Sequence, residues 1–153
     1  MNKDEYYMGI ALKEAKKAYF KGEVPVGAII VFNDEIIAKG HNLRERTNDI
    51  TKHAELIAIK RASHKYNGWR LEGTVMYVTL YPCPMCASAI VQSRIAKLVI
   101  GAPTLDLNNK KIVNQILKGN NTCLEVSKKV GILESECKSI LGDFFKLQRN
   151  KKC

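Results

Sequence analysis

Residues 73–100 read GTVMYVTLYPCPMCASAIVQSRIAKLVI and predict the centre of the fold. The run 73–80 is apolar and rich in β-branched side chains, as a buried strand is. Pro82 ends that strand, and Pro84 stands where a helix can begin, because proline fits the first helical turn. The apolar positions that follow have helical spacing as far as a second extended run, residues 97–100. We therefore expect a strand, a helix and another strand here.

The flanking segments also alternate between helical and extended patterns. Helical spacing predicts helices over residues 4–21, 53–64 and 131–149, and β-branched runs predict strands over residues 24–32 and 35–40. The turn pair Asn33-Asp34 joins the two strands into a predicted hairpin. Residues 43–52 are expected to form a loop, and residues 102–122 are poorly patterned apart from a short apolar stretch.

This order of elements predicts an α/β fold. Alternating helices and strands bury their apolar faces as a three-layer α/β/α sandwich, with helices on both sides of one mixed sheet. The length of 153 residues fits a single domain over residues 1–153. Charges interrupt the N-terminal segment and no run of about 18 apolar residues exists, so we expect no signal peptide, no membrane span and a cytoplasmic protein.

The chain is strongly basic. Twenty-five Lys and Arg against fifteen Asp and Glu give a formal net charge of +10. Such an excess favours a polyanionic partner, because Lys and Arg release counterions from a phosphate backbone. A solvated, lysine-rich surface explains the same composition, so the charge alone leaves both interpretations open.

The cysteines indicate one metal site. They stand at positions 83, 86, 123, 137 and 153, and an odd number with one close pair is a poor disulfide framework. Cys83 and Cys86 form a Cys-x-x-Cys pair at a predicted helix start, where both sulfurs can reach one metal and the positive helix end lowers the thiol pKa. His53 would complete three ligands. Three protein ligands leave the fourth tetrahedral position of Zn²⁺ for water, as in a catalytic site.

Simpler interpretations of these residues stay open. A Cys-x-x-Cys pair can be redox-active or form half of a structural zinc site, and a lone histidine is more often an ordinary residue than a ligand. A structural site needs a fourth ligand, for which Cys123 is the candidate, because the chain has no second Cys-x-x-Cys pair.

The segments His53-Ala54-Glu55 and PCPMC (82–86) resemble the His-x-Glu and Pro-Cys-x-x-Cys signature of zinc-dependent deaminases. Hydrolytic deamination removes a proton from water and delivers protons to the ring nitrogen and the departing amine, which one carboxylate can do. Glu55 is two residues from His53, so it points elsewhere than at the metal but can reach a zinc-activated water. We therefore predict Glu55 as the catalytic acid and base.

A resemblance to bacterial tRNA adenosine deaminases, within the cytidine-deaminase-like superfamily, covers almost the whole chain. Besides the two motifs, it rests on GEVPVGAIIV (22–31), GHN (40–42), YVTL (77–80), SRIAKLVIGA (93–102) and DFFKLQR (143–149). It implies a central five-stranded sheet, a homodimer with one Zn²⁺ per subunit, and conversion of the wobble adenosine of an arginine tRNA anticodon to inosine.

The resemblance also implies roles for single residues. His53, Cys83 and Cys86 match the zinc ligands, and Glu55 matches the proton shuttle. Asn42 matches a residue that hydrogen-bonds the flipped base, and Val26 matches a pocket-wall position. Phe145, Lys146 and Arg149, with Phe144, match a helix segment that grips the anticodon stem-loop. Asn42 could instead be a turn residue, Val26 a core valine, and at least one of the two phenylalanines a core residue.

The chain departs from that family pattern at three places. Tyr81 replaces a usual Glu, residues 49–52 (DITK) replace a usual Asp-Pro-Thr-Ala, and residues 103–111 (PTLDLNNKK) replace a Gly-rich loop that contacts RNA in the family. Neither of the first two touches the predicted ligands. The third leaves the RNA contacts of this segment open, so the sequence assigns no residue of 103–111 to RNA binding.

Two other functions compete with tRNA deamination. A deaminase of a free base or nucleoside, such as guanine or cytosine, would share the zinc site, but an uncharged small substrate gains nothing from a basic surface. A catalytically silent partner subunit or zinc-stabilised RNA-binding module would have no need for Glu55.

Overall fold

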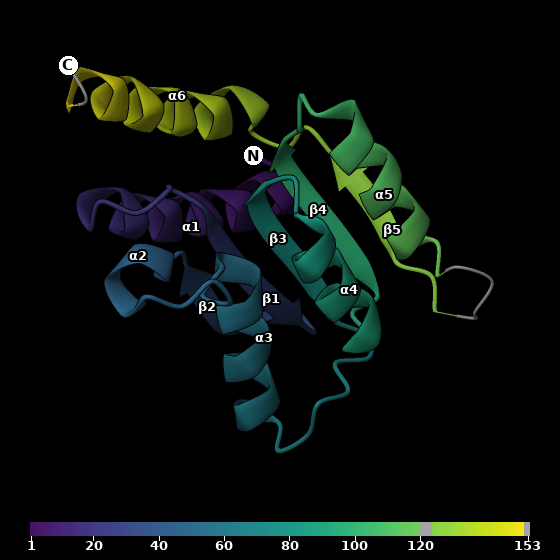
Figure 1. Ribbon diagram of the computed structural model, residues 1–153. Coiled ribbons are helices and arrows are strands. Elements are labelled where there is room, and N and C mark those ends of the chain that lie inside the picture. The colour runs from purple at the N-terminus through teal and green to yellow at the C-terminus, as the bar shows by residue number, and fades with distance from the viewer. Residues whose placement is uncertain (120–123, 152–153) are drawn as a thin grey trace.

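A five-stranded mixed sheet forms the centre of the molecule (Figure 1). The computed structural model describes residues 1–119 and 124–151. The strand order is β2-β1-β3-β4-β5, in which β1 is antiparallel to β2 and β3, whereas β3, β4 and β5 run parallel. The strands are β1 (Gly27–Phe32), β2 (Glu35–His41), β3 (Val75–Leu80), β4 (Lys97–Ala102) and β5 (Ser127–Val130).

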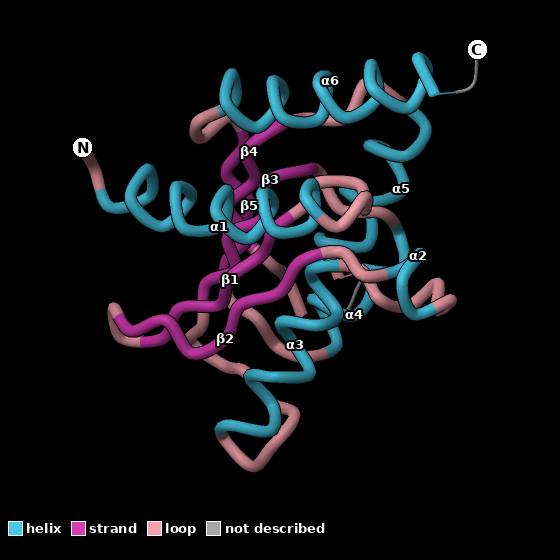
Figure 2. The backbone as a smooth tube through the Cα atoms, turned by 90° about the vertical axis from the view of Figure 1, so that its left-hand side faces the viewer, coloured by secondary structure: helices cyan, strands magenta, loops and turns pink. Residues whose placement is uncertain are grey.

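Helices cover both faces of this sheet (Figures 1 and 2). One face carries α1 (Lys3–Phe20) and α6 (Glu134–Lys151), and the other carries α3 (Ala54–Lys65), α4 (Pro84–Gln92) and α5 (Leu107–Leu117). The short helix α2 (Arg44–Thr47) lies between β2 and α3 in the chain. The predicted three-layer α/β/α sandwich with a five-stranded mixed sheet is therefore confirmed.

Two glycines let helices lie directly on the sheet. A Cβ atom at Gly27 would lie 2.0 Å from the carbonyl oxygen of Ala11 in α1. A Cβ atom at Gly40 would lie 2.5 Å from the carbonyl oxygen of Ala54, at the start of α3. Real Cβ atoms do not approach this closely, so both positions need glycine. The contact at Gly40 sets how near the first turn of α3 lies to strand β2.

The predicted hairpin is confirmed, with a tight two-residue turn. Asn33 and Asp34 have φ values of 48° and 65°, the left-handed conformations of a type I′ turn. Phe32 pairs with Glu35 directly across the turn. Strand β1 begins at Gly27 instead of residue 24, because Pro25 lacks the N–H that a ladder position donates.

Other parts of the sequence prediction were incomplete. The predicted loop 43–52 contains α2, and the poorly patterned segment 102–122 contains α5. Strand β5 was not predicted, because it is short, polar and exposed at every position (SKKV), as edge strands can be. Helix α6 begins three residues later than predicted, since the left-handed backbone of Gly131 and Leu133 precedes it.

Within residues 1–119 and 124–151, no helix has both the length and the apolar character needed to cross a membrane.

Candidate active site and metal centre

Three predicted metal ligands meet where two neighbouring helices begin. His53 is the N-cap residue of α3, and Cys83 is the N-cap residue of α4 with Pro84 at the first helical position. The Nδ1 atom of His53 lies 3.8 Å from Sγ of Cys83 and 3.5 Å from Sγ of Cys86. All three ligand atoms lie within 4.8 Å of one another.

The donor set fits a zinc ion. Zn–S bonds of about 2.3 Å and a Zn–N bond of about 2.0–2.1 Å, at a tetrahedral angle, separate sulfur from nitrogen by about 3.6 Å. The two sulfur–nitrogen distances here, 3.8 and 3.5 Å, lie on either side of that value. Within the described residues, no other group of three His, Cys, Asp or Glu side chains clusters in this way. Cys137 is a buried free thiol elsewhere, and Cys123 and Cys153 lie outside the described residues.

The two thiols of the site differ in acidity because they are hydrogen-bonded to each other. The hydrogen bond from Cys86, together with His53, lowers the pKa of the Cys83 thiol to about 4. The same Cys83–Cys86 hydrogen bond, reinforced by burial, raises the pKa of the Cys86 thiol. Without metal, the pair therefore holds one proton between two sulfurs, and a cation that binds both as thiolates displaces that proton.

Glu55 is a buried carboxyl group beside the ligands. Its side chain is 3% exposed, and burial raises the pKa of Glu55, with the charge of Cys83 acting in the same direction. A carboxyl group with a raised pKa can carry a proton near neutral pH and release it again, which a proton shuttle must do. The arrangement can therefore move protons next to a metal-held water.

His53, Cys83 and Glu55 line one small pocket, whereas Cys86 is buried behind it. Its volume is about 160 Å³, and its walls are formed by Val24, Val26, Asn42, Arg44, His53, Glu55, Leu80, Tyr81 and Cys83. Binding sites for drug-sized ligands hold about 300–1,000 Å³, so this pocket suits a single planar base. The structure thus brings five predicted site residues, Asn42, Val26, His53, Glu55 and Cys83, to one cavity.

Known proteins resemble this chain over most of its length. Residues 1–102 match the family model of the cytidine and deoxycytidylate deaminase zinc-binding region. The chain is 46% identical over 152 residues to a tRNA-specific adenosine deaminase of Bacillus subtilis (strain 168), covering 99% of this chain and 94% of the relative. It is 44% identical over 149 residues to a tRNA-specific adenosine deaminase of Buchnera aphidicola subsp. Schizaphis graminum (strain Sg), covering 97% of each. The chain belongs to the tRNA-specific adenosine deaminase family.

Solved structures agree with this assignment. A tRNA:A34 deaminase structure from work on A-to-I editing at the wobble position of transfer RNA superposes with a TM-score of 0.80 and 36% identity, covering 89% of this chain and 99% of that one. A guanine deaminase from Nitrosomonas europaea superposes with a TM-score of 0.78 at 20% identity, covering 92% and 83%. The second likeness shows that the deaminase shares its fold with base deaminases.

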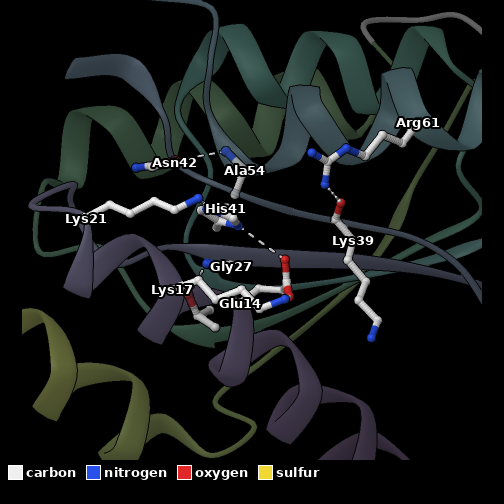
Figure 3. Close-up of polar contacts among 10 residues, drawn as sticks. Glu14, Lys17, Lys21, Gly27, Lys39, His41, Asn42, Ala54 and Arg61 are labelled. Carbon is white, nitrogen blue, oxygen red and sulfur yellow. Dashed lines mark hydrogen bonds and ion pairs between the residues drawn. The ribbon is translucent and has the colours of Figure 1, made fainter. Parts of the chain in front are cut away.

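Asn42 connects this small pocket to helix α3. Its Oδ1 atom accepts a 2.8 Å hydrogen bond from the backbone N–H of Ala54, the residue between His53 and Glu55 (Figure 3). The side chain of His53 makes no capping hydrogen bond, so Asn42 satisfies a first-turn N–H of α3 in its place. The amide group of Asn42 is thereby held in one orientation on the pocket wall.

Sequence reasoning missed Glu23, which fixes the helix that carries the pocket residue Arg44. Glu23 is 1% exposed, and its carboxylate accepts hydrogen bonds from the backbone N–H groups of Glu45 (3.0 Å) and Arg46 (2.8 Å) in α2. These bonds fix α2, whose first residue, Arg44, lines the pocket. The available signal was an acidic residue inside the apolar stretch 22–31, where a charge needs a partner.

A polar cluster around the buried side chains of His41 and Glu14 lies next to Asn42 (Figure 3). The Nδ1 atom of His41 lies 3.3 Å from Oε1 of Glu14, and its Nε2 atom lies 3.0 Å from Nζ of Lys21. Because the ammonium group of Lys21 has no lone pair, Nε2 must accept, so Nδ1 carries the hydrogen and donates to Glu14. Lys17 forms a 2.7 Å ion pair with the same carboxylate. The cluster ties the end of β2 to α1 with a neutral His41.

The three residues matched to RNA binding lie apart from the pocket, on α6. Phe145 is 48% exposed, and Lys146 and Arg149 are exposed as well, whereas Phe144 is buried. Phe144 therefore belongs to the core, as expected for one of the two phenylalanines. None of Phe145, Lys146 and Arg149 is among the residues that line the pocket beside the metal ligands.

Proposed function

We propose that the protein hydrolyses the wobble adenosine of a tRNA anticodon to inosine, with an arginine tRNA as its substrate. The observation that carries the proposal is that His53, Cys83, Glu55 and Asn42 line a single pocket of about 160 Å³. The near full-length similarity to tRNA-specific adenosine deaminases supports RNA over a free base as the substrate.

The pocket walls suit a purine that has left its stack. The Oδ1 atom of Asn42 is engaged with Ala54, so its NH₂ group is the part that can donate to a ring nitrogen of the base. Val26 is 5% exposed and supplies apolar contact with the ring. A pocket of this size leaves the sugar and phosphates outside, so the base must be flipped into it, which costs least in a single-stranded loop.

Zn²⁺ held by His53, Cys83 and Cys86 would supply a water that is acidic near neutral pH. Glu55 accepts one proton from that water and delivers a proton to the adjacent ring nitrogen. The water oxygen would bond to carbon 6, and Glu55 would then carry the proton of the new hydroxyl group to the exocyclic amine, which leaves carbon 6 as ammonia while the oxygen stays on the ring as a carbonyl. The balance is one water consumed and one ammonia released for each inosine formed.

The rest of the RNA requires contacts outside the pocket. Phe145, Lys146 and Arg149 form an exposed aromatic and basic segment on α6 that would contact the anticodon stem-loop. The net charge of +10 suits a polyanionic partner. The proposal includes a single cytoplasmic domain and a homodimer, as the family resemblance implies, and light scattering of the purified protein measures the subunit number.

A substrate panel tests the proposal. The purified zinc protein is incubated with stem-loops that carry adenosine at the wobble position, one with an arginine anticodon and one with another anticodon, and with free adenosine, guanine and cytosine. Ammonia release and inosine content are measured for each. Inosine in the arginine stem-loop alone is the expected result. Turnover of a free base with an untouched stem-loop would overturn the proposal.

A further inference from the structure

Tyr81 separates the base pocket from a second depression on the surface. Its side chain lines the base pocket with Glu55 and Cys83 and is 5% exposed. Its hydroxyl group donates a 2.5 Å hydrogen bond to Oδ1 of Asn114 in α5. Asn114 in turn lines a groove of about 390 Å³, together with Leu107, Lys110, Lys111, Gln115 and Lys118. The hydrogen bond between Tyr81 and Asn114 is therefore where the two depressions adjoin.

The second depression carries a concentrated positive charge. Three of its six lining residues are lysines, at 110, 111 and 118, and residues 107–118 contain no Asp or Glu. The nearest carboxylate in the chain, Asp106, is engaged as the N-cap of α5, where it accepts from the N–H groups of Asn108 and Asn109. No acidic side chain of α5 offsets the three lysines.

Lys128, on strand β5, extends this charge to the edge of the base pocket. Its Nζ atom lies 2.5 Å from Oδ1 of Asn114 and 3.2 Å from the hydroxyl oxygen of Tyr81, and it lies 5.6 Å from the centre of the Tyr81 ring. The two hydrogen bonds use two of its three N–H donors, which leaves a donor for a ligand. Tyr81 and Asn114 thus hold an ammonium group beside the pocket.

We propose that Lys128 and the groove lysines bind the RNA phosphate next to the flipped nucleoside. This inference rests on the proposed function. When the base occupies a pocket of about 160 Å³, its sugar and flanking phosphates remain outside the walls. Arg44 and Tyr81 both line the pocket, and Lys128 is hydrogen-bonded to the hydroxyl group of Tyr81. A phosphate on the Tyr81 side therefore meets a cation held in place by two hydrogen bonds. Lys110 and Lys118, farther along the groove, would contact the neighbouring phosphates of the RNA backbone.

Salt dependence of RNA binding tests the groove. The double variant Lys110→Ala/Lys118→Ala and the single variant Lys128→Met are compared with Lys13→Ala/Lys16→Ala, which removes two exposed lysines from α1 on the opposite face of the sheet. The Kd of a labelled anticodon stem-loop and the KM for deamination are measured from 50 to 300 mM salt. At low salt, both groove variants should bind the stem-loop more weakly than the wild type does. Their slope of log Kd against log salt should be shallower than the wild-type slope by about 0.7 per lost phosphate contact. The α1 control should keep the wild-type slope.

A stem-loop with one uncharged methylphosphonate linkage, placed on either side of the wobble adenosine, identifies the phosphate. In the wild type one of the two linkages should weaken binding, and in Lys128→Met the same linkage should have no further effect. The inference would be overturned if both groove variants had the wild-type slope. It would also be overturned if each methylphosphonate linkage weakened RNA binding by Lys128→Met as much as it weakens binding by the wild type. A wild-type protein that binds the stem-loop with these slopes but forms no inosine would overturn the proposed function alone.

Discussion

The side-chain oxygen of Asn42 accepts a hydrogen bond from the backbone N–H of Ala54 at 2.8 Å. Ala54 lies between the metal ligand His53 and the buried carboxyl group of Glu55. The residue proposed to hold the base is therefore attached to the helix turn that carries the ligand and the proton shuttle. If Asn42 were displaced, the base that it holds would shift relative to His53 and Glu55.

Two substitutions separate the two roles of Asn42. Asn42→Asp keeps an oxygen for the Ala54 N–H but loses the NH₂ donor, so we expect near wild-type melting and a kcat/KM about 10- to 100-fold lower, the cost of one unmade hydrogen bond to substrate. Asn42→Ala should lose activity and also about 1 kcal/mol of stability, because the helix loses its cap. Full activity in Asn42→Asp would show that the NH₂ group of Asn42 does not bind the base.

Much of the site could be predicted from the sequence because its chemistry is local. His53 and Glu55 are two residues apart, and Cys83 and Cys86 are three apart, so each pair is fixed by one helix start. The strands and helices that present them have strong apolar patterns, which explains why β3 and α4 were predicted close to their observed bounds. The distance between the two helix starts, in contrast, is set by long-range packing.

The parts that could not be predicted depend on partners far away in the chain. Strand β5 is a strand because it pairs with β4, and nothing in SKKV itself favours a strand. Helix α2 exists because the carboxylate of Glu23, more than twenty residues earlier, accepts its first N–H groups. The contact of Tyr81 with Asn114 and Lys128 joins three elements, so no local pattern reports it.

Cys83→Ala should abolish zinc binding and activity together. Two remaining ligands cannot hold the ion as three do, and the low pKa of the Cys83 thiol, about 4, makes it the group that is already a thiolate at neutral pH. Elemental analysis of the purified variant gives the zinc content. Cys137→Ala is the matched control, because it removes a buried thiol outside the cluster and should keep one zinc per chain. Full zinc in Cys83→Ala would exclude Cys83 from the ligand set.

His41 should make the stability of the protein depend on pH below about 6.5. Burial lowers the pKa of His41 below its ordinary value of 6.5, and the charges of Lys21 and Lys17 act in the same direction, while Glu14 opposes them. The unfolded chain then binds more protons than the folded one in this range, so the free energy of unfolding falls as the pH drops through 6.5.

Urea unfolding at pH 7.5 and pH 5.5 measures the effect. The loss of stability between the two pH values should be smaller in His41→Gln than in the wild type, because the variant has no imidazole to protonate. Equal losses in the two proteins would show that His41 does not contribute to this pH dependence.

Gly40→Ala should destabilise the protein and disturb the site. The new methyl group would meet the carbonyl oxygen of Ala54 at 2.5 Å and the backbone nitrogen of Ala58 at 2.9 Å, so α3 must shift, at a cost of about 1–3 kcal/mol. Gly142→Ala is the matched control, since a Cβ there meets nothing within 4 Å and alanine favours the helix α6. Melting temperatures of the two variants should move in opposite directions. A stable Gly40→Ala protein would contradict the close packing of β2 on α3.

The most direct test of the account is the rate of inosine formation by Glu55→Gln at full zinc content, measured on a wobble-adenosine stem-loop beside the wild type. Glutamine has the shape of glutamate but cannot take up and release a proton as a carboxylate does. We expect unchanged zinc and RNA binding and a kcat lower by about 10²- to 10⁴-fold or more, the usual contribution of a general acid and base. A kcat close to wild type in the zinc-loaded variant would contradict the assignment of proton transfer to Glu55.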